Sequence, residues 1–511
     1  MSLLLGIDIG TSATKAVLIE EDGRVRATAR VEYPLSQPLA GWAEQDPGQW
    51  WEAAAVAVRE IWTRTGLDGK AVAGVGLSGQ MHGLVLLDSA YRVLRPAILW
   101  CDQRTGAECA WLNREIGVEQ LYRWTGNPAL PGFTAPKVLW VRRHEPEIYR
   151  QISHFLLPKD YVRFRLTGEL ATDVSDASGT LLLDVATRRW SSRMLAALDI
   201  PEAWLPALYE STEVTGKVSP EAAADTGLLA GTPIVGGGGD QAAGAIGLGI
   251  VAEGILSAAL GTSGVIFATT EKPRMQPGSS LHTFCHAAPG RWHLMGVMLA
   301  AGASLQWFRD QLGGEEIRKA AQTSADPYGL LTEQAAAVGP GAEGLLFLPY
   351  LLGERTPHPD PAARGGFIGL TMRHHKGHMV RAILEGVAFG LRDSLELLHK
   401  GGVMVKEIRV SGGGARSRLW RHILASVFKY PVTTVNSMEG PALGAALLAG
   451  VGVGIYSSVE TACSDIIKVT SREEAVPGEV NAYEQVYALY KTLYPLLQGT
   501  MHELTKLTEL K

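Results

Sequence analysis

Short apolar runs alternate with polar, glycine-containing turns along the first hundred residues. The runs at 3–9 and 16–19 flank a Gly-Thr-Ser turn and predict two adjacent strands, and Asp22-Gly23 predicts a hairpin turn into a third. Residues 46–62 begin with Asp-Pro and carry apolar side chains on one face, which is typical of a capped helix. Residues 72–77 predict another strand. Strands that alternate with helices in this way favour an α/β fold.

The middle of the chain, over residues 234–247, contains an apolar strand, four consecutive glycines and an Ala-rich helix start. Asp240 stands where the strand ends and the helix begins. Glycines there allow the backbone to approach a ligand, and the helix start directs free N–H groups and a partial positive charge toward it. A carboxylate in this position can cap the helix or accept a proton. The run alone leaves both interpretations open.

A strand, a Gly-Thr-Ser turn and a second strand recur around Gly261-Thr262, as in the first hairpin. The spacing is too long for a solenoid repeat and predicts two domains built alike. Ala259 stands where Asp8 stands in the first copy, so only the first hairpin carries a carboxylate. Asp8 lies in an apolar strand, which is costly without a partner, and a bound Mg²⁺ would supply one. An ordinary hairpin with a polar tip is the alternative.

Two further glycine-rich helix starts lie in the second half, at residues 408–415 and 439–446. Together they predict a nucleotide that rests on backbone groups. The helix expected at 379–399 contains charged residues that exclude a membrane span. Residues beyond about 456 predict a helical tail with no chemistry of its own.

Two polar segments in the first half, at residues 78–83 and 101–104, follow expected strands. Ligands in α/β sheets gather beyond the carboxyl ends of strands, so both segments are candidate ligand sites. His82 is either a solvated loop histidine or a ligand-binding one. Residues 172–179 fit a capped turn or a substrate-side loop, and the sequence does not separate the two.

The composition narrows the class of protein. The chain has 511 residues, which indicates two or more domains, and 46% of them are hydrophobic. A formal charge of −5 without a long basic stretch gives little support to nucleic-acid binding. Four cysteines without a Cys-x-x-Cys pair indicate neither disulfides nor a zinc site, and reduced thiols fit the cytoplasm. No apolar run reaches the length of a membrane span, and the first residues lack the features of a signal peptide.

Taken together, these motifs resemble the FGGY family of carbohydrate kinases, within the actin-like ATPase superfamily. The resemblance covers nearly the whole chain and includes, beside the motifs above, residues 301–307, 353–358 and 364–370. It implies two actin-like ATPase (ribonuclease H-like) α/β domains with an interdomain cleft. Residues 1–247 would bind the sugar, and residues 248–511 would bind the nucleotide and end in the helical tail.

The resemblance also implies a role for each motif. Asp240 is expected to be the catalytic base and Asp8 to hold Mg²⁺. The residues expected to contact ATP are Thr11, Ser12, Lys15, Gly261, Thr262, Gly302, Gln306 and Gly414. Those expected to contact the sugar are Met81, His82, Asp102 and Gln241.

Three segments, at residues 80–83, 100–104 and 282–286, are most similar to the xylulokinase members of the family. This similarity implies ATP-dependent phosphorylation of D-xylulose to D-xylulose 5-phosphate in the cytoplasm. Some of those members have Asn after the catalytic Asp, where this chain has Gln241. The expected ligands are the sugar, ATP and Mg²⁺; no nucleic acid or membrane partner is expected, and a homodimer is left open.

Three alternatives remain at this point. One is a kinase for another ketose or a polyol. Another is an actin-like ATPase that hydrolyses ATP with water, but many of those carry an acid in the second hairpin, where this chain has Ala259. The third is a sugar-binding regulator without catalysis, which the presence of both Asp8 and Asp240 disfavours.

Overall fold

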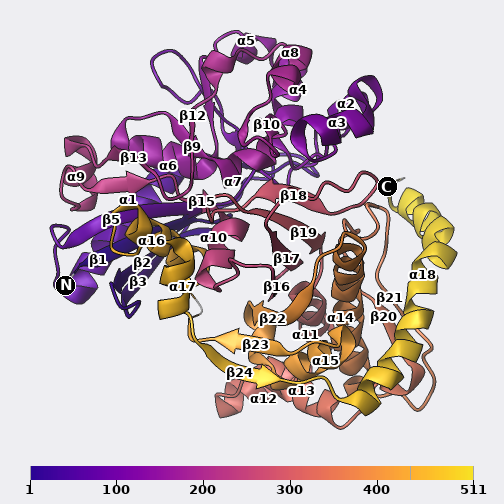
Figure 1. Ribbon diagram of the computed structural model, residues 1–511. Coiled ribbons are helices and arrows are strands. Elements are labelled where there is room, and N and C mark those ends of the chain that lie inside the picture. Colours follow the sequence, from indigo (N-terminus) through magenta and orange to yellow (C-terminus); the bar gives the residue numbers. More distant parts are fainter. Residues whose placement is uncertain (1, 438, 510–511) are drawn as a thin grey trace.

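The computed structural model describes residues 2–437 and 439–509. They form two halves, each built on a seven-stranded sheet with helices packed against it (Figure 1). Each sheet contains an antiparallel hairpin whose first strand also pairs in parallel with a later strand. The predicted α/β fold with two similarly built halves is therefore confirmed.

The first sheet has the strand order β13-β14-β5-β1-β2-β3, and β15 also pairs with β5. Asp8 of β1 lies opposite Lys15 of β2 and Ser78 of β5, so three polar side chains meet near the carboxyl end of β1. The strands are β1 (Leu3–Ile9), β2 (Ala13–Glu20), β3 (Val25–Glu32), β5 (Val72–Gly79), β13 (Val214–Lys217), β14 (Pro233–Val235) and β15 (Gly238–Gly239).

The second sheet has the order β18-β19-β17-β16-β22-β23-β24. Its hairpin repeats the first one, with Ala259 of β16 opposite Val265 of β17 and Ser411 of β22. The strands are β16 (Gly254–Leu260), β17 (Gly264–Thr270), β18 (His282–Cys285), β19 (Trp292–Met298), β22 (Val405–Ser411), β23 (Val432–Val435) and β24 (Val469–Glu473).

Short strand pairs shape the loops around these sheets. These pairs are β4 (Glu44–Gln45) with β7 (Ala97–Ile98), β6 (Val85–Leu87) with β8 (His154–Leu156), β9 (Ala171–Asp173) with β12 (Ala207–Tyr209), β10 (Leu183–Asp184) with β11 (Arg189–Trp190), and β20 (Leu346–Leu348) with β21 (Gly366–Ile368).

The helix expected at residues 46–62 is α1 (Pro47–Thr65), and Asp46 caps it by accepting a hydrogen bond from the Gly48 N–H. The first half also contains the helices α2 (Gly106–Leu112), α3 (Val118–Thr125), α4 (Thr134–His144), α5 (Pro146–Tyr149), α6 (Pro158–Thr167), α7 (Val174–Ala177), α8 (Ser192–Leu198), α9 (Pro220–Thr226) and α10 (Asp240–Gly247).

The second half has α14 (Lys376–Lys400) at its centre, and most of the residues of this helix are buried. Around it lie α11 (Gly302–Leu312), α12 (Gly314–Thr323), α13 (Pro327–Ala336) and α15 (Arg418–Phe428), with α18 (Pro477–Glu509) along the outer edge (Figure 1). In the part of the chain that the structure describes, no helix combines the length and apolarity needed to cross a bilayer.

The expected tail beyond residue 456 is helical only in part. β24 interrupts it between α17 (Val459–Ile466) and α18, and pairs antiparallel with β23 at the edge of the second sheet. The expected helical tail therefore also contains one strand, because β24 gains its backbone partners from a strand that lies far away in sequence.

Helix α16 (Pro441–Gly452) comes from the second half but packs against β1, β5 and α10 of the first (Figure 1). Glycines permit this contact. A Cβ atom added to Gly76 would lie 1.9 Å from the Ala445 carbonyl oxygen, and one added to Gly444 would lie 1.8 Å from the Ala243 carbonyl oxygen. Backbone thus contacts backbone where the two halves meet. The boundary at residue 247 stays a prediction, since the structure places α16 on the first sheet.

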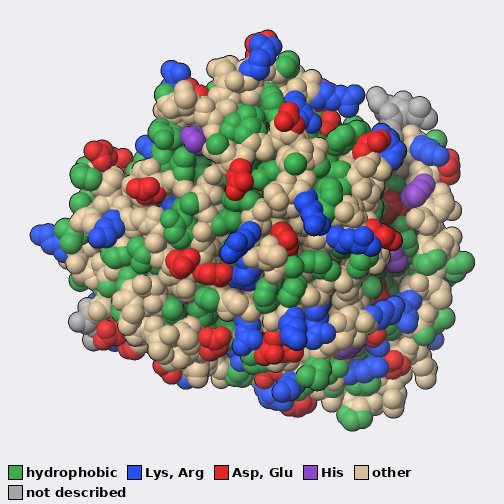
Figure 2. Space-filling view, turned by 45° about the horizontal axis from the view of Figure 1, so that its top comes forward, with side chains coloured by type: hydrophobic (Ala, Val, Ile, Leu, Met, Phe, Trp, Pro, Cys, Tyr) green, Lys and Arg blue, Asp and Glu red, His purple; other side chains and the backbone are tan. Residues whose placement is uncertain are grey.

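The face drawn in Figure 2 carries acidic and basic side chains interspersed, with apolar side chains scattered between them. Such a mixed surface is ordinary for a globular protein.

Replacing Gly76 with alanine tests the close contact between β5 and α16. The added methyl group meets a backbone carbonyl that cannot rotate away, so we expect Gly76→Ala to destabilise the fold by about 1–3 kcal/mol. Thermal unfolding followed by circular dichroism measures this as a lower Tm.

Gly106→Ala is the matched control, because nothing lies within 4 Å of the added carbon and Gly106 begins helix α2. Its Tm should stay the same or rise. An unchanged Tm for Gly76→Ala would show that the interface between α16 and the first sheet is looser than described.

Candidate active site

A cavity of about 630 Å³ lies between the two halves. Asp8 and Lys15 reach it from the first hairpin, and Asp240 and Gln241 from the start of α10. The second half contributes residues from β16, β22 and the segment before α16, namely Ser257, Ala259, Val410, Ser411, Gly412, Glu439 and Gly440. Residues that are distant in sequence therefore face one space.

Asp240 does not cap its helix. The N-cap position of α10 is Gly239, and Asp240 is the first residue of the helix itself, with its side chain lining the cavity. This resolves the alternative that the sequence left open, because the carboxylate is not used as a structural cap.

The two carboxyl groups of the cavity have raised pKa values. Burial, and then the negative charge of Asp8, raise the pKa of Asp240 to about 7. Burial raises the pKa of Asp8 to about 6, although Ser78 and the positive charge of Lys15 act in the opposite direction. Like charges in a poorly solvated site resist simultaneous ionisation. Asp240 is thus poised to gain or lose a proton near neutral pH.

Asp8 also has the features of a partial metal site. Its Oδ1 atom is buried and has no hydrogen-bond partner in the described part of the chain. Within residues 2–437 and 439–509, no group of three or more His, Cys, Asp or Glu side chains could hold a metal ion without help. Mg²⁺ is commonly held by one or two carboxylates together with waters and phosphate oxygens, so a single unpaired carboxylate fits such an ion.

A second cavity, of about 780 Å³, adjoins the first, since Gly413 and Arg416 line both. Five residues expected at the nucleotide line it, namely Gly261, Thr262, Gly302, Gln306 and Gly414. The turn of the second hairpin is fastened to the start of α11, where the Gly302 N–H donates to the Gly261 carbonyl oxygen at 2.8 Å. Exposed backbone at a hairpin turn and at helix starts is suited to phosphate oxygens.

The first Gly-Thr-Ser turn is held on one side and open on the other. The Thr11 hydroxyl accepts a hydrogen bond from Trp100 Nε1 at 2.9 Å and donates one to Gln80, whereas Ser12 is exposed. Lys15 forms an ion pair with Glu439 of the second half, with 2.6 Å between Nζ and Oε2. An anion that enters the cavity would compete with Glu439 for this lysine.

His82 has a left-handed backbone with φ of 69°, which is strained for a residue with a Cβ atom. Its carbonyl oxygen accepts hydrogen bonds from Lys137 Nζ at 2.8 Å and from the Thr134 hydroxyl at 3.1 Å. Its ring Nδ1 lies 2.7 Å from the Gly179 carbonyl oxygen, and since a carbonyl can only accept, Nδ1 carries the proton. Burial holds the pKa of His82 well below its usual value, so the ring is neutral and Nε2 is left as an acceptor.

Met81 lies between His82 and the glycine that precedes Asp240. Its side chain is 4% exposed and packs against Gly239, where an added Cβ would lie 2.8 Å from Met81 Cγ. Asp240, Met81 and His82 therefore lie in one continuous region.

Asp102 is not available to a sugar. It is fully buried, and its oxygens accept hydrogen bonds from the Ala43 N–H at 2.6 Å and from the Arg104 guanidinium at 2.7 Å. The prediction that Asp102 contacts the substrate is corrected here, because its acceptor sites are already filled. Its role is to orient Arg104, whose guanidinium lies 3.6 Å from the centre of the Trp42 ring.

Residues 172–179 turn out to be both a capped turn and a supporting loop. Asp173 caps α7 and accepts a hydrogen bond from the Ser175 N–H, and the Ser175 hydroxyl accepts one from the Gly239 N–H at 3.2 Å. Gly179 holds the His82 ring. Sequence reasoning missed the supporting roles of Ser175, Gly179 and Lys137; a lysine in the apolar run 135–141 was the one visible signal.

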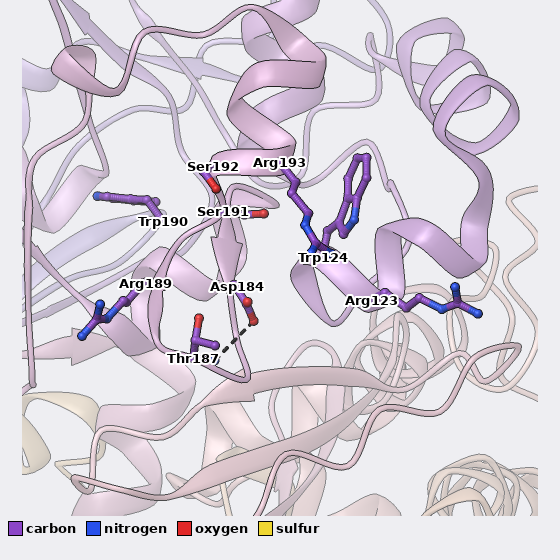
Figure 3. Close-up of a pocket in the computed structure, with 9 residues that line it drawn as sticks. All are labelled: Arg123, Trp124, Asp184, Thr187, Arg189, Trp190, Ser191, Ser192 and Arg193. Carbon is purple, nitrogen blue, oxygen red and sulfur yellow. Dashed lines mark hydrogen bonds between the residues drawn. The ribbon is translucent and has the colours of Figure 1, made fainter.

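A separate cavity of about 590 Å³ lies at the β10–β11 hairpin (Figure 3). None of the expected site residues lines it. In Figure 3 the side chains of Arg123 and Arg189 point away from one another, and Asp184 is bonded to the Thr187 N–H at 3.3 Å. This cavity has no convergent polar groups comparable with those of the interdomain cleft.

Comparison with known proteins agrees with the geometry. Residues 3–247 match the N-terminal domain of the FGGY family of carbohydrate kinases, and residues 256–453 match its C-terminal domain. The chain is 44% identical to the xylulose kinase of Escherichia coli (strain K12) over 503 residues, which cover 97% of this chain and 100% of the relative. It is 33% identical to the gluconokinase of Bacillus subtilis (strain 168), with 98% and 96% covered.

The fold is also close to solved structures. The crystal structure of a xyloylose kinase from Brucella ovis superposes with a TM-score of 0.90 at 40% identity, over 98% of this chain and 100% of that one. The family models and the near full-length relatives lead to one conclusion: the chain belongs to the FGGY family of carbohydrate kinases.

Proposed function

We propose that this carbohydrate kinase transfers the γ-phosphoryl group of ATP to a terminal hydroxyl of D-xylulose and releases D-xylulose 5-phosphate and ADP. The observation that carries the proposal is the position of Asp240, whose carboxylate lines the cleft next to the nucleotide-type cavity. The relative at 44% identity, a xylulose kinase, supports the choice of sugar.

The nucleotide would occupy the cavity lined by Gly261, Thr262, Gly302, Gln306 and Gly414. Its terminal phosphates would extend toward the first hairpin, where Ser12 offers its hydroxyl and both Thr11 and Ser12 offer backbone N–H groups. Lys15 would exchange its ion pair with Glu439 for phosphate oxygens. Contacts from both hairpins would hold the phosphates in line for transfer.

Asp8 would hold Mg²⁺ together with phosphate oxygens and water, since its Oδ1 has no hydrogen-bond partner among the residues that the structure describes. When bound, the ion would offset the negative charge that builds up on the transferred group. Side chains of the protein itself would supply proton transfer and sugar binding.

Asp240 would accept the proton of the attacking hydroxyl. Its raised pKa, about 7, brings it close to the operating pH, where a base both exists in its unprotonated form and accepts protons effectively. Met81 would form an apolar wall beside the sugar. His82 Nε2 would accept a hydrogen bond from a sugar hydroxyl, and the Gln241 amide would bind another.

We also place the reaction in the cytoplasm. The four cysteines of the chain are all free thiols, which supports a reducing compartment. The homodimer considered from the sequence stays a prediction.

The choice of substrate can be tested with a panel of acceptors. ADP release should be measured with D-xylulose, D-ribulose, L-ribulose, glycerol and gluconate at saturating ATP. We expect the highest kcat/KM for D-xylulose. A higher value for another acceptor would reassign the sugar, and equal ADP release without any sugar would indicate an ATPase instead of a sugar kinase.

Replacing Asp240 with asparagine tests the base assignment. The amide cannot accept the proton, so we expect Asp240→Asn to keep its fold and to lower kcat by roughly 10²- to 10⁴-fold. In the wild type, kcat/KM should fall as the pH drops through about 7, because protonation of Asp240 removes the base. The Asp240→Asn variant should not show this fall of kcat/KM with decreasing pH.

Asp465→Asn is the matched control, since Asp465 is exposed and outside the cleft. It should retain the wild-type rate and pH profile. Wild-type turnover by Asp240→Asn would refute the base assignment.

A further inference from the structure

Arg355 is one of the positively charged side chains that the mechanism above does not use. It lies in the segment 353–358, between β20 and β21 of the second half. A Cβ atom added to Gly132 of the first half would lie 3.9 Å from Arg355 Nη2. The guanidinium therefore reaches across the division between the halves and lies against the loop that precedes α4.

The Arg355 guanidinium interacts electrostatically with Glu354 but is not hydrogen-bonded to its carboxylate. Among the described residues it forms no hydrogen bond, ion pair or ring contact, although the side chain is half-buried. Its neighbour Glu354 is directed elsewhere, since Oε1 accepts from the Arg355 and Leu299 N–H groups at 2.7 and 3.2 Å. Burial raises the pKa of Glu354 to about 8, so this carboxyl is largely uncharged at neutral pH. Half-burying a guanidinium without hydrogen bonds costs folding free energy, unless a bound ligand accepts those hydrogen bonds.

The backbone beside Arg355 is firmly held. The Thr356 N–H donates to the Val297 carbonyl oxygen at 3.0 Å, and the Thr356 hydroxyl donates to the Ser280 carbonyl oxygen at 3.1 Å. Thr356 Oγ1 also accepts from the Val297 N–H at 3.2 Å. Arg355 thus projects from a position fixed to β19 and to the segment before β18.

Arg355 lies beside Gly132, and the carbonyl oxygens of Gly132 and His82 both accept hydrogen bonds from Lys137 Nζ at 2.8 Å. The positive charge of Arg355 helps to lower the pKa of both His82 and His282, although burial is the main cause for each. Both rings are therefore neutral. The His282 ring stacks on Phe284 at 5.6 Å and lies edge-on to Phe133 at 5.7 Å, both measured between ring centroids. Here the site offers one acceptor, His82 Nε2, and one strong donor, the Arg355 guanidinium.

The order of these groups along the site determines the orientation in which an acceptor sugar would bind. Asp240 follows Gly239, and a Cβ atom added to Gly239 would touch Met81, which precedes His82. Lys137 links the His82 carbonyl oxygen to the Gly132 carbonyl oxygen, and Gly132 lies beside Arg355. An acceptor whose reacting hydroxyl lies at Asp240 would have its opposite end at His82 and Arg355. In a 2-ketopentose that is phosphorylated on C5, the opposite end carries the C2 carbonyl oxygen.

We propose that Arg355 is a specificity-determining residue that donates hydrogen bonds to the carbonyl oxygen of the acceptor sugar. The inference rests on the proposed function and extends it, because it makes the second half contribute to sugar recognition. The guanidinium gives its hydrogen bonds to a carbonyl oxygen, and a carboxylate at that end of an aldonate would bind it more strongly still. An alditol lacks both groups, so it loses this interaction.

Three variants test the proposal: Arg355→Met, Arg355→Lys and, as control, Arg373→Met. Arg373 is an exposed arginine of the same half that is paired with Glu343. For each we would measure kcat, KM for D-xylulose, KM for ATP, and the inhibition constant of xylitol against D-xylulose. Thermal unfolding would report whether each variant folds.

We expect Arg355→Met to raise the KM for D-xylulose by about tenfold or more, with the KM for ATP unchanged. The inhibition constant of xylitol should change by less than about threefold, since xylitol has no carbonyl group. Arg355→Lys should recover part of the loss because it restores a charged donor, and Arg373→Met should behave as wild type.

An unchanged KM for D-xylulose in Arg355→Met would overturn the proposal. So would equal losses for D-xylulose and xylitol, or a raised KM for ATP, because a merely structural role affects all ligands together. Failure of the wild type to phosphorylate D-xylulose would contradict the proposed function instead. The same comparison would then be made between the best acceptor of the panel and its alditol.

Discussion

The site depends on two carboxyl groups, Asp8 and Asp240, placed in one poorly solvated cleft. Burial disfavours the charge of each, and the charge of Asp8 further disfavours ionisation of Asp240. Two such negative charges are unfavourable without nearby cations. Lys15 offsets their repulsion only in part, because its ammonium group is paired with Glu439. A phosphate-bound metal ion and a hydroxyl that gives up its proton would relieve the same unfavourable charge, so the cleft is electrostatically suited to its reactants.

The position of those carboxyl groups depends on the contact between α16 and the first sheet. Asp8 lies one residue before the end of β1 and Asp240 begins α10, and α16 packs against both elements at backbone distance. Side chains larger than glycine at Gly76 and Gly444 would separate the elements and change the spacing of the two carboxylates. Because α16 belongs to the second half in sequence, the same contact also joins the two halves beside the cleft.

Much of this arrangement could be predicted from local sequence. Asp240, the repeated Gly-Thr-Ser turns and the glycine-rich helix starts each form a short motif with its own backbone requirements. The five nucleotide residues at Gly261, Thr262, Gly302, Gln306 and Gly414 therefore gather in one cavity as expected.

The remainder depends on pairs of residues that are far apart in sequence. Asp102 was wrongly assigned to the sugar because nothing in the sequence indicates that Arg104 and Ala43 fill its acceptor sites. The support of His82 by Lys137 and Gly179, and the reach of Arg355 toward Gly132, arise only when distant segments pack together. Edge strand β24 was missed for the same reason.

The most direct test of the account is a crystal structure of the protein with D-xylulose and a non-hydrolysable ATP analogue. The account predicts that a terminal hydroxyl of the sugar is hydrogen-bonded to the Asp240 carboxylate and faces the terminal phosphate of the nucleotide. A sugar bound elsewhere, or a nucleotide whose phosphates lie away from Asp8 and Asp240, would contradict it.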